Sequence, residues 1–349
     1  MKDLLAQLLR GTPLTAAQTE SAFTDIMDGT TDPAQTAALL TLLATREPAV
    51  DELQGAATVM RRHVVAIDAP DDVIDTCGTG GVASTFFNIS TTVALVAAAC
   101  GVPVCKHGNR GITSRSGSSD VLRALGVNIE TSPEQEARCL REAGICFAFA
   151  PRHHPAMKHV AAIRKALGFS TLFNLLGPLT NPAGTRRQVV GTRSPELADK
   201  LLEVLVRLGA IRALVVCGRD PRAGALCDIS VTGDTHVAEF DGKIGEGGVI
   251  EGRTRHFTLR PEELGLPRHA DSADLIIKSP EDSARKIRAI LTGKDRTAAR
   301  DIVLANAAAA LWVAGRVSDF PAGIPHAAEA IDSGKAALHL EKLAALSHD

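Results

Sequence analysis

The sequence predicts an α/β protein in which a small helical domain is followed by a larger α/β domain with a mostly parallel central sheet. Two observations support this fold class. Residues 1–68 carry helical patterns and little else, whereas short apolar β runs alternate with helical stretches from Val73 onward. Such alternation is typical of parallel sheets, which bind ligands at the carboxyl ends of their strands. A chain of 349 residues is long enough for both domains.

The helices of the first part have recognisable starts. Thr15 and Gln18 have the spacing of a capping box, and Asp32 followed by Pro33 supplies an N-cap and a first-turn proline. The run 37–43 that follows has leucines on more than one side, which predicts that this helix is buried against others. The first part is therefore expected to form a helical subdomain.

The larger part is expected to contain strands at 73–76, 102–106, 145–148 and 212–217, with a helix at 88–100 between the first two. Glycine and proline interrupt regular structure between 174 and 182. Near the end of the chain, the alanine- and leucine-rich stretches 299–315 and 327–346 are expected to be helices.

Two glycine-containing loops lie one βαβ unit apart. Residues 78–81 follow the first expected strand, and residues 106–110 with 116–120 follow the second. Glycine lets the backbone approach a phosphate closely, and a helix N-terminus supplies free N–H groups and the positive end of a dipole. Three basic side chains add charge: Lys106, Arg110 and Arg115. Residues 78–81 alone are more typical of a plain strand-to-helix turn, but the two loops together predict phosphate binding.

The composition points to small-molecule partners. The net charge of −2 offers no overall attraction to nucleic acid or to a membrane, so an anionic ligand needs a local site. Aromatic residues make up only 3% of the chain, which argues against a surface that stacks on bases. Neither nucleic acid nor a membrane is therefore an expected partner.

The cysteines and the start of the chain indicate a cytoplasmic protein. None of the seven cysteines forms a CxxC pair, which favours free thiols in a reducing compartment over a disulfide framework or a metal cluster. The first residues lack a signal-peptide pattern. The longest apolar stretch, 93–105, is interrupted by Gly101 and Pro103 and is too short to span a bilayer.

Motifs beyond the two loops make the pattern specific. They are Phe149-Ala150-Pro151, His154 to Lys158, Arg164, Leu167-Gly168 and the long block Phe173 to Pro182. With the loops, they resemble the anthranilate phosphoribosyltransferase family over roughly residues 1–265. The resemblance implies a pentosyltransferase of tryptophan biosynthesis, which transfers phosphoribosyl from phosphoribosyl pyrophosphate (PRPP) to the amine of anthranilate and releases pyrophosphate.

The same resemblance implies the cofactor, the assembly and the domain limits. It implies Mg²⁺, a homodimer and the fold that phosphoribosyltransferases share with nucleoside phosphorylases. The helical domain would comprise 1–68 joined by part of 165–188, and the α/β domain 71–164 and 189–349. The site would lie in the cleft between the two domains.

The resemblance also assigns residues to the site. For PRPP it implies Gly78, Thr79, Gly80, Gly81, Val82, Asn88, Ile89, Ser90, Thr91, Lys106 and Ser118. For anthranilate it implies Gly78, His107, Asn109 and Arg164, and for the metal Ser90 and Asp228, with Cys227 at the other acidic position. Without the family, Ser90 is better explained as an N-cap or first-turn serine, Lys106 as a solvated strand-end residue and Arg164 as a surface arginine. His107 is a candidate proton acceptor, although a substrate-lining role is favoured.

The sequence departs from the family pattern in three regions. Val82-Ala83 stands where the family has Asp-Gly, with Phe86 in place of a threonine shortly after. Cys227-Asp228 stands for an Asp-Glu pair, and Ser170 stands for an arginine. Mg²⁺ prefers hard oxygen ligands, so Cys227 is expected to pack and metal binding to be weaker. Two alternatives remain open: a phosphorylase-like paralogue with another donor or acceptor, and a non-catalytic relative that binds a ligand or nucleic acid.

Overall fold

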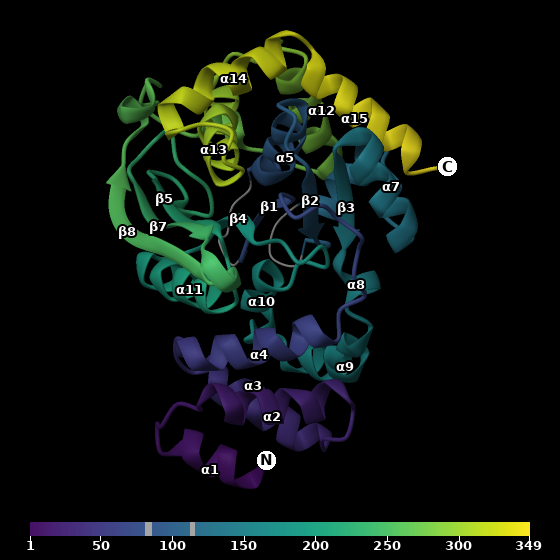
Figure 1. The fold of residues 1–349 in the computed structure, drawn as a ribbon, viewed down its shortest axis with the longest axis vertical. Coiled ribbons are helices and arrows are strands. Elements are labelled where there is room, and N and C mark those ends of the chain that lie inside the picture. The colour runs from purple at the N-terminus through teal and green to yellow at the C-terminus, as the bar shows by residue number, and fades with distance from the viewer. Residues whose placement is uncertain (81–85, 112–115) are drawn as a thin grey trace.

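The computed structural model describes residues 1–80, 86–111 and 116–349, and it consists of a helical part and a larger α/β part (Figure 1). The site predictions at Gly81 and Val82, like Arg115, lie outside the described residues. The predicted fold class is confirmed: a small N-terminal group of helices is followed by an α/β unit with a mostly parallel sheet.

The helical part begins with α1 (Lys2–Leu9), α2 (Ala16–Met27), α3 (Pro33–Ala44) and α4 (Val50–Arg62). The capping box is confirmed, since Thr15 and Gln18 exchange both of its hydrogen bonds. The carboxylate of Asp32 accepts from the first-turn amides of α3, as expected for an N-cap. Two later helices, α9 (Lys158–Leu167) and α10 (Phe173–Leu176), pack against these four, with the ring centroids of Phe23 and Phe173 5.4 Å apart. The exact domain limits stay a prediction.

The sheet runs in the order β3-β2-β1-β4-β5-β7-β8, with β6 paired to β5. Its parallel strands are β1 (Ile74–Gly78), β2 (Val104–Gly108), β3 (Ile145–Phe149), β4 (Arg187–Gly191) and β5 (Arg212–Asp220). The antiparallel strands are β6 (Gly224–Leu226), β7 (Thr235–Ile244) and β8 (Ile250–Leu259). All four predicted strands are present. Strand β4 and the β7–β8 hairpin were not predicted from the sequence.

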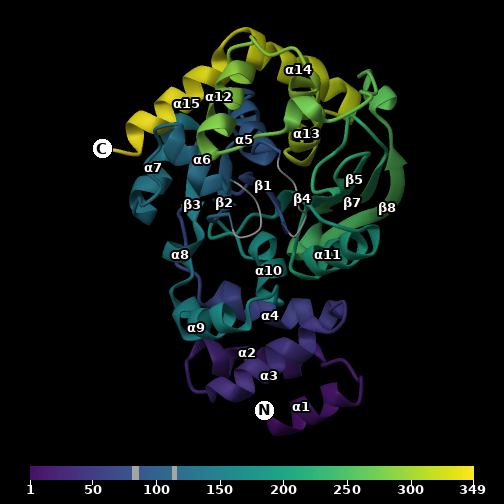
Figure 2. The same cartoon turned by 180° about the vertical axis from the view of Figure 1, so that it is seen from behind.

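Helices cover both faces of the sheet (Figure 2). They are α5 (Ile89–Ala99), α6 (Ser118–Ala124), α7 (Pro133–Ala143), α8 (Ala150–His153), α11 (Pro195–Arg207), α12 (Pro280–Leu291), α13 (Ala298–Val313), α14 (Phe320–Asp332) and α15 (Lys335–Leu346). The prediction of one helix over 327–346 is wrong. Gly334 adopts a left-handed conformation with φ 76°, which ends one helix and starts the next.

Two hydrophobic cores lie on opposite faces of the sheet. Along β5, Leu214 and Val216 join the core under α5 and α12–α15, whereas Ala213 and Val215 face α11 and the helical part. This alternation follows from the two-residue period of a strand. The second core is continuous from α11 to α2 and α4, so it fixes the helical part against the carboxyl ends of β1 and β2.

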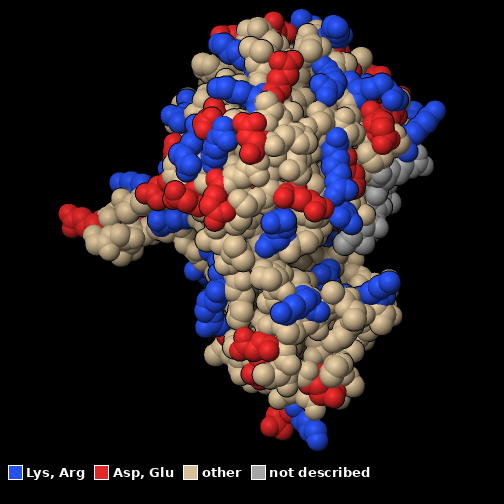
Figure 3. Space-filling model, turned by 90° about the vertical axis from the view of Figure 1, so that its right-hand side faces the viewer, with Lys and Arg blue, Asp and Glu red and all other residues tan. Residues whose placement is uncertain are grey.

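The surface carries mixed charge. Figure 3 shows basic and acidic side chains interspersed over one face, and the hairpin projecting from the body. Among the described helices, none combines the length and the apolar run needed to cross a bilayer. All seven cysteines lie in the described part and are free, as predicted.

Candidate active site

A cavity of about 1400 Å³ lies between the carboxyl ends of β1 and β2 and the helices α9 and α10. Most of the predicted site residues line it: Gly78, Thr79, Gly80, Asn88, Ile89, Ser90, Lys106, His107, Asn109, Ser118, Arg164, Cys227 and Asp228. Thr91 does not line it, because its side chain is buried beneath the first turn of α5. Segments from both parts of the chain therefore meet around one cavity.

Helix α5 begins at this cavity without a side-chain cap. Asn88 occupies the N-cap position, but its amide instead contacts the second loop and α12. The Oδ1 atom of Asn88 accepts from the hydroxyls of Ser116 and Ser283, each at 2.9 Å, and its Nδ2 donates to the Ser116 carbonyl at 3.0 Å. The Ile89 N–H donates to the Phe87 carbonyl at 2.8 Å, whereas within the described part of the chain the N–H groups of Ser90 and Thr91 remain available to an anion. The Asn88 side chain joins the two loops.

Lys106 is the buried cation of the site. Only 3% of it is exposed, which excludes the interpretation as a solvated strand-end residue. Its Nζ atom donates to the Thr76 carbonyl at 2.6 Å and to Ser90 Oγ at 3.2 Å. Burial lowers the pKa of Lys106, and the nearby carboxylates of Asp75 and Asp228 oppose that shift. The amino group of Lys106 is therefore held in place between the two glycine loops.

The three residues predicted to bind the metal all line the cavity but differ in their chemistry. Burial raises the pKa of Asp228 to about 7, against the opposing effect of Lys106. Burial also raises the pKa of the Cys227 thiol far above its usual value, and its Sγ atom faces the Gly80 carbonyl at 3.8 Å. A protonated thiol is a poor ligand for Mg²⁺. These residues fit one Mg²⁺ held by Asp228 and by oxygens of a diphosphate, but not a site with two carboxylates.

Arg164 occupies the opposite wall, on α9. Its guanidinium stacks over the ring of Phe173 at 5.3 Å from the centroid, and Nη2 donates to Asn174 Oδ1 at 3.2 Å. Partial burial lowers the pKa of Arg164. These contacts exclude a freely solvated surface arginine. They hold a guanidinium at the cavity, where it suits a carboxylate through charge-assisted hydrogen bonds.

His107 forms a pair with His154. His154 belongs to one of the family motifs but was not predicted as a site residue. The Nδ1 atom of His107 donates to the Gly177 carbonyl at 3.0 Å, so its Nε2 atom accepts from His154 Nε2 at 3.3 Å. Burial lowers the pKa of His107 to about 3 and that of His154 to about 4. Both imidazoles are neutral near pH 7 and too weakly basic to serve as proton acceptors, which disfavours that role for His107.

Two arginines that line the cavity, Arg193 and Arg46, were not predicted from the sequence. Arg193 follows β4 and pairs with Glu47 of the α3–α4 loop, so this ion pair joins the two parts of the chain. Arg46 pairs with the fully buried Glu52. Each is a single arginine in a loop without a motif. Only recognition of β4 could have placed Arg193 at a strand end.

Fold and site define the class of protein, a glycosyl transferase with a helical bundle and an α/β domain. The helical bundle domain of the glycosyl transferase family matches residues 2–64, and the a/b domain of that family matches residues 70–337.

Individual relatives define the family more narrowly. The chain is 47% identical to the anthranilate phosphoribosyltransferase of Rubrobacter xylanophilus, covering 99% of this chain and 97% of the relative, and 48% identical to that of Rhodospirillum rubrum, covering 99% and 95%. The crystal structure of the Thermus thermophilus enzyme is similar with a TM-score of 0.87 and 37% identity, covering 99% of both chains. The Saccharomyces cerevisiae enzyme in complex with PRPP and Mg has a TM-score of 0.85 and 27% identity, covering 99% of this chain and 96% of that one. The chain belongs to the anthranilate phosphoribosyltransferase family.

Proposed function

We infer that this protein transfers the phosphoribosyl group of PRPP to the amine of anthranilate and releases pyrophosphate, as a pentosyltransferase of tryptophan biosynthesis. The observation that carries this conclusion is one cavity with an anion-binding wall on the α/β side and Arg164 on the helical side. The two walls suit the two substrates, a polyphosphate and an aromatic carboxylate.

The α/β wall is proposed to bind PRPP. Residues 78–80 and the first turn of α5 would surround a diphosphate, with the backbone N–H groups of Gly80, Ser90 and Thr91 as donors, since those of Thr79 and Ile89 already donate to backbone carbonyls. Lys106 and the Ser118 hydroxyl would be further donors. Departure of pyrophosphate leaves a positively charged, oxocarbenium-like sugar. Donors that are already in place stabilise the charge developing on the leaving group, which is often the largest single contribution to such a step.

The opposite wall is proposed to bind anthranilate. Arg164 would hold the carboxylate, while Asn109 and the neutral His107 would line the ring and the amine. The anthranilate amine is neutral and nucleophilic, so attack on the sugar does not require a strong base. This agrees with the low pKa values of His107 and His154, about 3 and about 4.

Asp228 is proposed to hold Mg²⁺ together with Ser90. A Mg²⁺ ion held there would supply positive charge to the diphosphate leaving group. Because Cys227 supplies no carboxylate, the metal requirement is expected to be met at higher Mg²⁺ concentration than in a relative with two acids. We also propose that the enzyme acts in the cytoplasm as a homodimer, as the family resemblance implies.

Replacing Arg164 by alanine is expected to impair use of the acceptor and not of the donor. Loss of a hydrogen bond to a charged group corresponds to about 1.5 to 3 kcal/mol, or roughly ten- to a hundredfold in kcat/KM for anthranilate. Steady-state kinetics with each substrate varied would measure this. The exposed Arg152 on α8 provides the control, since Arg152→Ala should change neither term. A loss confined to the PRPP term would remove Arg164 from the acceptor site.

Gly80→Val is expected to weaken PRPP binding. Gly80 has φ 64°, and among the described residues a Cβ atom there would meet no atom within 4 Å, so the added side chain would occupy the space proposed for the phosphate. Gly126→Val is the matched control, because Gly126 also has a left-handed φ and open space but lies at the end of α6. Calorimetric titration of PRPP compares the variants. Equal affinities in Gly80→Val and Gly126→Val would contradict the proposed loop.

Restoring two acids is expected to strengthen metal binding. Cys227→Asp with Asp228→Glu supplies two hard carboxylates and should lower the Mg²⁺ concentration that gives half-maximal rate. Cys227→Ser, which adds no charge, is the control. If the lineage had changed to a metal-free donor, the added acids would instead repel the anionic substrate and depress activity at every Mg²⁺ concentration. The companion change, Val82→Asp with Ala83→Gly, concerns residues outside the described part.

An assay of two donors separates the proposed function from the phosphorylase-like alternative. The enzyme should consume PRPP in the presence of anthranilate and Mg²⁺. It should release no free base from a pyrimidine nucleoside and inorganic phosphate without metal. Nucleoside cleavage in the absence of PRPP turnover would favour the alternative, and no turnover with either donor would favour a non-catalytic binding protein.

A further inference from the structure

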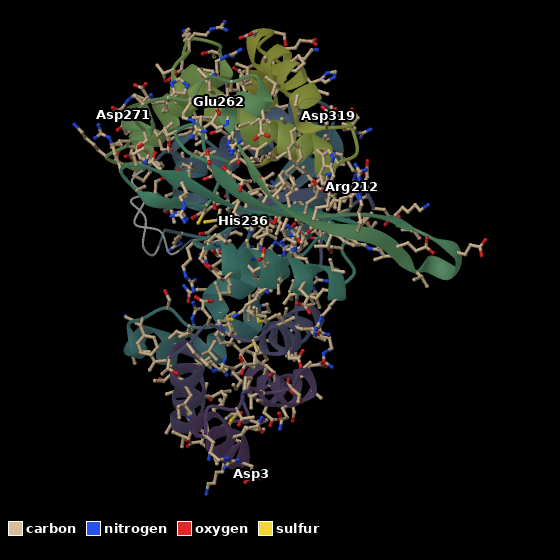
Figure 4. The ribbon with its side chains drawn as sticks, turned by 90° about the vertical axis from the view of Figure 1, so that its left-hand side faces the viewer. Asp3, Arg212, His236, Glu262, Asp271 and Asp319 are labelled. Carbon is tan, nitrogen blue, oxygen red and sulfur yellow. The ribbon has the colours of Figure 1, made fainter. Side chains whose placement is uncertain are left out.

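A group of metal-ligating side chains lies outside the active site, where the β7–β8 hairpin meets α11. Asp199 comes from α11, His236 from β7 and His256 from β8. The register pairs His236 with Thr258 and Ala238 with His256, so both histidines point to the same face of the hairpin, the face toward α11. Figure 4 labels His236 over the body of the domain, near the start of β7 and away from the projecting tip of the hairpin.

The three donor atoms converge closely. Asp199 Oδ1 lies 2.8 Å from His236 Nε2 and 2.8 Å from His256 Nδ1, and all three atoms lie within 4.8 Å of one another. Each imidazole now donates a ring N–H to the same carboxylate oxygen. A change of tautomer, in which the proton moves to the other ring nitrogen, turns each donor into a lone pair that faces the same point.

The site is open to solvent on one side. The exposed fractions of the side chains are 46% for Asp199, 24% for His236 and 45% for His256, so a cation can reach them without unfolding. Three protein ligands with room for a water molecule correspond to the coordination of many four-coordinate zinc sites.

We propose that Asp199, His236 and His256 form a binding site for a borderline divalent transition metal, with Zn²⁺ as the fitting cation. Two imidazole nitrogens and one carboxylate oxygen suit Zn²⁺ and its neighbours in the first transition row, whereas Mg²⁺ prefers all-oxygen ligands. The site is therefore chemically distinct from the proposed Mg²⁺ position at Asp228, and it does not depend on the proposed reaction.

A bound cation would connect α11 to both strands of the hairpin. It would bind the folded chain better than the unfolded one, because only folding brings the three donors together. The two most distant of them, Asp199 and His256, are 57 positions apart in the sequence. A ligand that binds only the folded state raises its stability by an amount that grows with the logarithm of the ligand concentration relative to Kd. Zn²⁺ is therefore expected to raise the melting temperature of the full-length protein.

The test is a titration of metal-free protein with Zn²⁺ in the presence of excess Mg²⁺ and a competing chelator, alongside melting curves. Wild type should bind one Zn²⁺ per chain at this site, and the tetrahedral visible spectrum of a Co²⁺ substitute should appear in parallel. His256→Gln and Asp199→Asn should each weaken that binding by at least about tenfold and remove the gain in melting temperature. His236→Gln gives a third independent variant.

The control is His269→Gln. His269 also lies 2.8 Å from a carboxylate, that of Asp301, but this pair does not belong to the group of three donors. Its removal should leave stoichiometry and affinity unchanged. The proposal is overturned if wild type shows no stoichiometric binding, or if the Asp199 and His256 variants, folded by their metal-free melting curves, bind Zn²⁺ as wild type does.

Discussion

Lys106→Met is expected to lower kcat/KM for PRPP by about a hundred- to a thousandfold, the range found when one preorganised donor is removed from a developing negative charge. Methionine keeps much of the apolar stem but removes the ammonium that contacts Thr76 and Ser90. The loss should appear in the PRPP term and in kcat, because the charge of the leaving group grows in the transition state. Steady-state kinetics with PRPP varied measure it.

The exposed Lys278 provides the control for this prediction. Lys278→Met removes the same charge from an exposed side chain that does not line the cavity and should leave the kinetics unchanged. Because Lys106 also faces Asp75 and Asp228, a thermal melt must establish that the Lys106 variant is folded. A folded Lys106→Met enzyme with wild-type kcat/KM would contradict the role of this residue at the diphosphate.

Gly191→Ala is expected to damage both the fold and the site. A Cβ atom at Gly191, the last residue of β4, would overlap the backbone carbonyl of Cys227. Gly191 also pairs with Gly78 in the sheet, so any shift reaches the first glycine loop and Asp228 together. Forcing an atom into a packed contact destabilises by about 1 to 3 kcal/mol, and PRPP turnover should fall as well.

Chemical denaturation measures the stability change, with Gly177→Ala as its control. A Cβ atom at Gly177 would meet no atom of the described residues within 4 Å, so that variant should keep wild-type stability. Wild-type stability and PRPP turnover in Gly191→Ala would mean that the strand end and residues 227–228 are not held in contact as described.

The main features of the fold were predictable because short stretches of the sequence encode them. Capping residues marked the first helices, and short apolar runs marked β1, β2, β3 and β5. Strand β4 was not predicted, because its five residues include Arg187 and Gln188 and do not alternate between apolar and polar. The β7–β8 hairpin was not predicted, because β8 is largely exposed and its residues are mostly polar. The break at Gly334 depends on a single backbone conformation inside an otherwise uniform helical pattern.

Site residues that belong to a loop motif or a family motif could be predicted from the sequence. Site residues that are defined by contacts between distant segments could not. The pairing of Glu47 with Arg193 spans 146 positions, and that of His107 with His154 spans 47. The burial of Lys106 depends on the packing of β1, α5 and residue 228 around it, which no local pattern encodes. Long-range contacts of this kind also decide that Cys227 keeps its proton.

The stoichiometry of turnover tests the central claim most directly. The enzyme would be incubated with PRPP, anthranilate and Mg²⁺, and the anthranilate consumed and the pyrophosphate released would be measured in the same sample. The account predicts one pyrophosphate released for each anthranilate consumed, and negligible release when either anthranilate or Mg²⁺ is omitted. Pyrophosphate release that does not depend on anthranilate, or no consumption of anthranilate by folded enzyme, would contradict it.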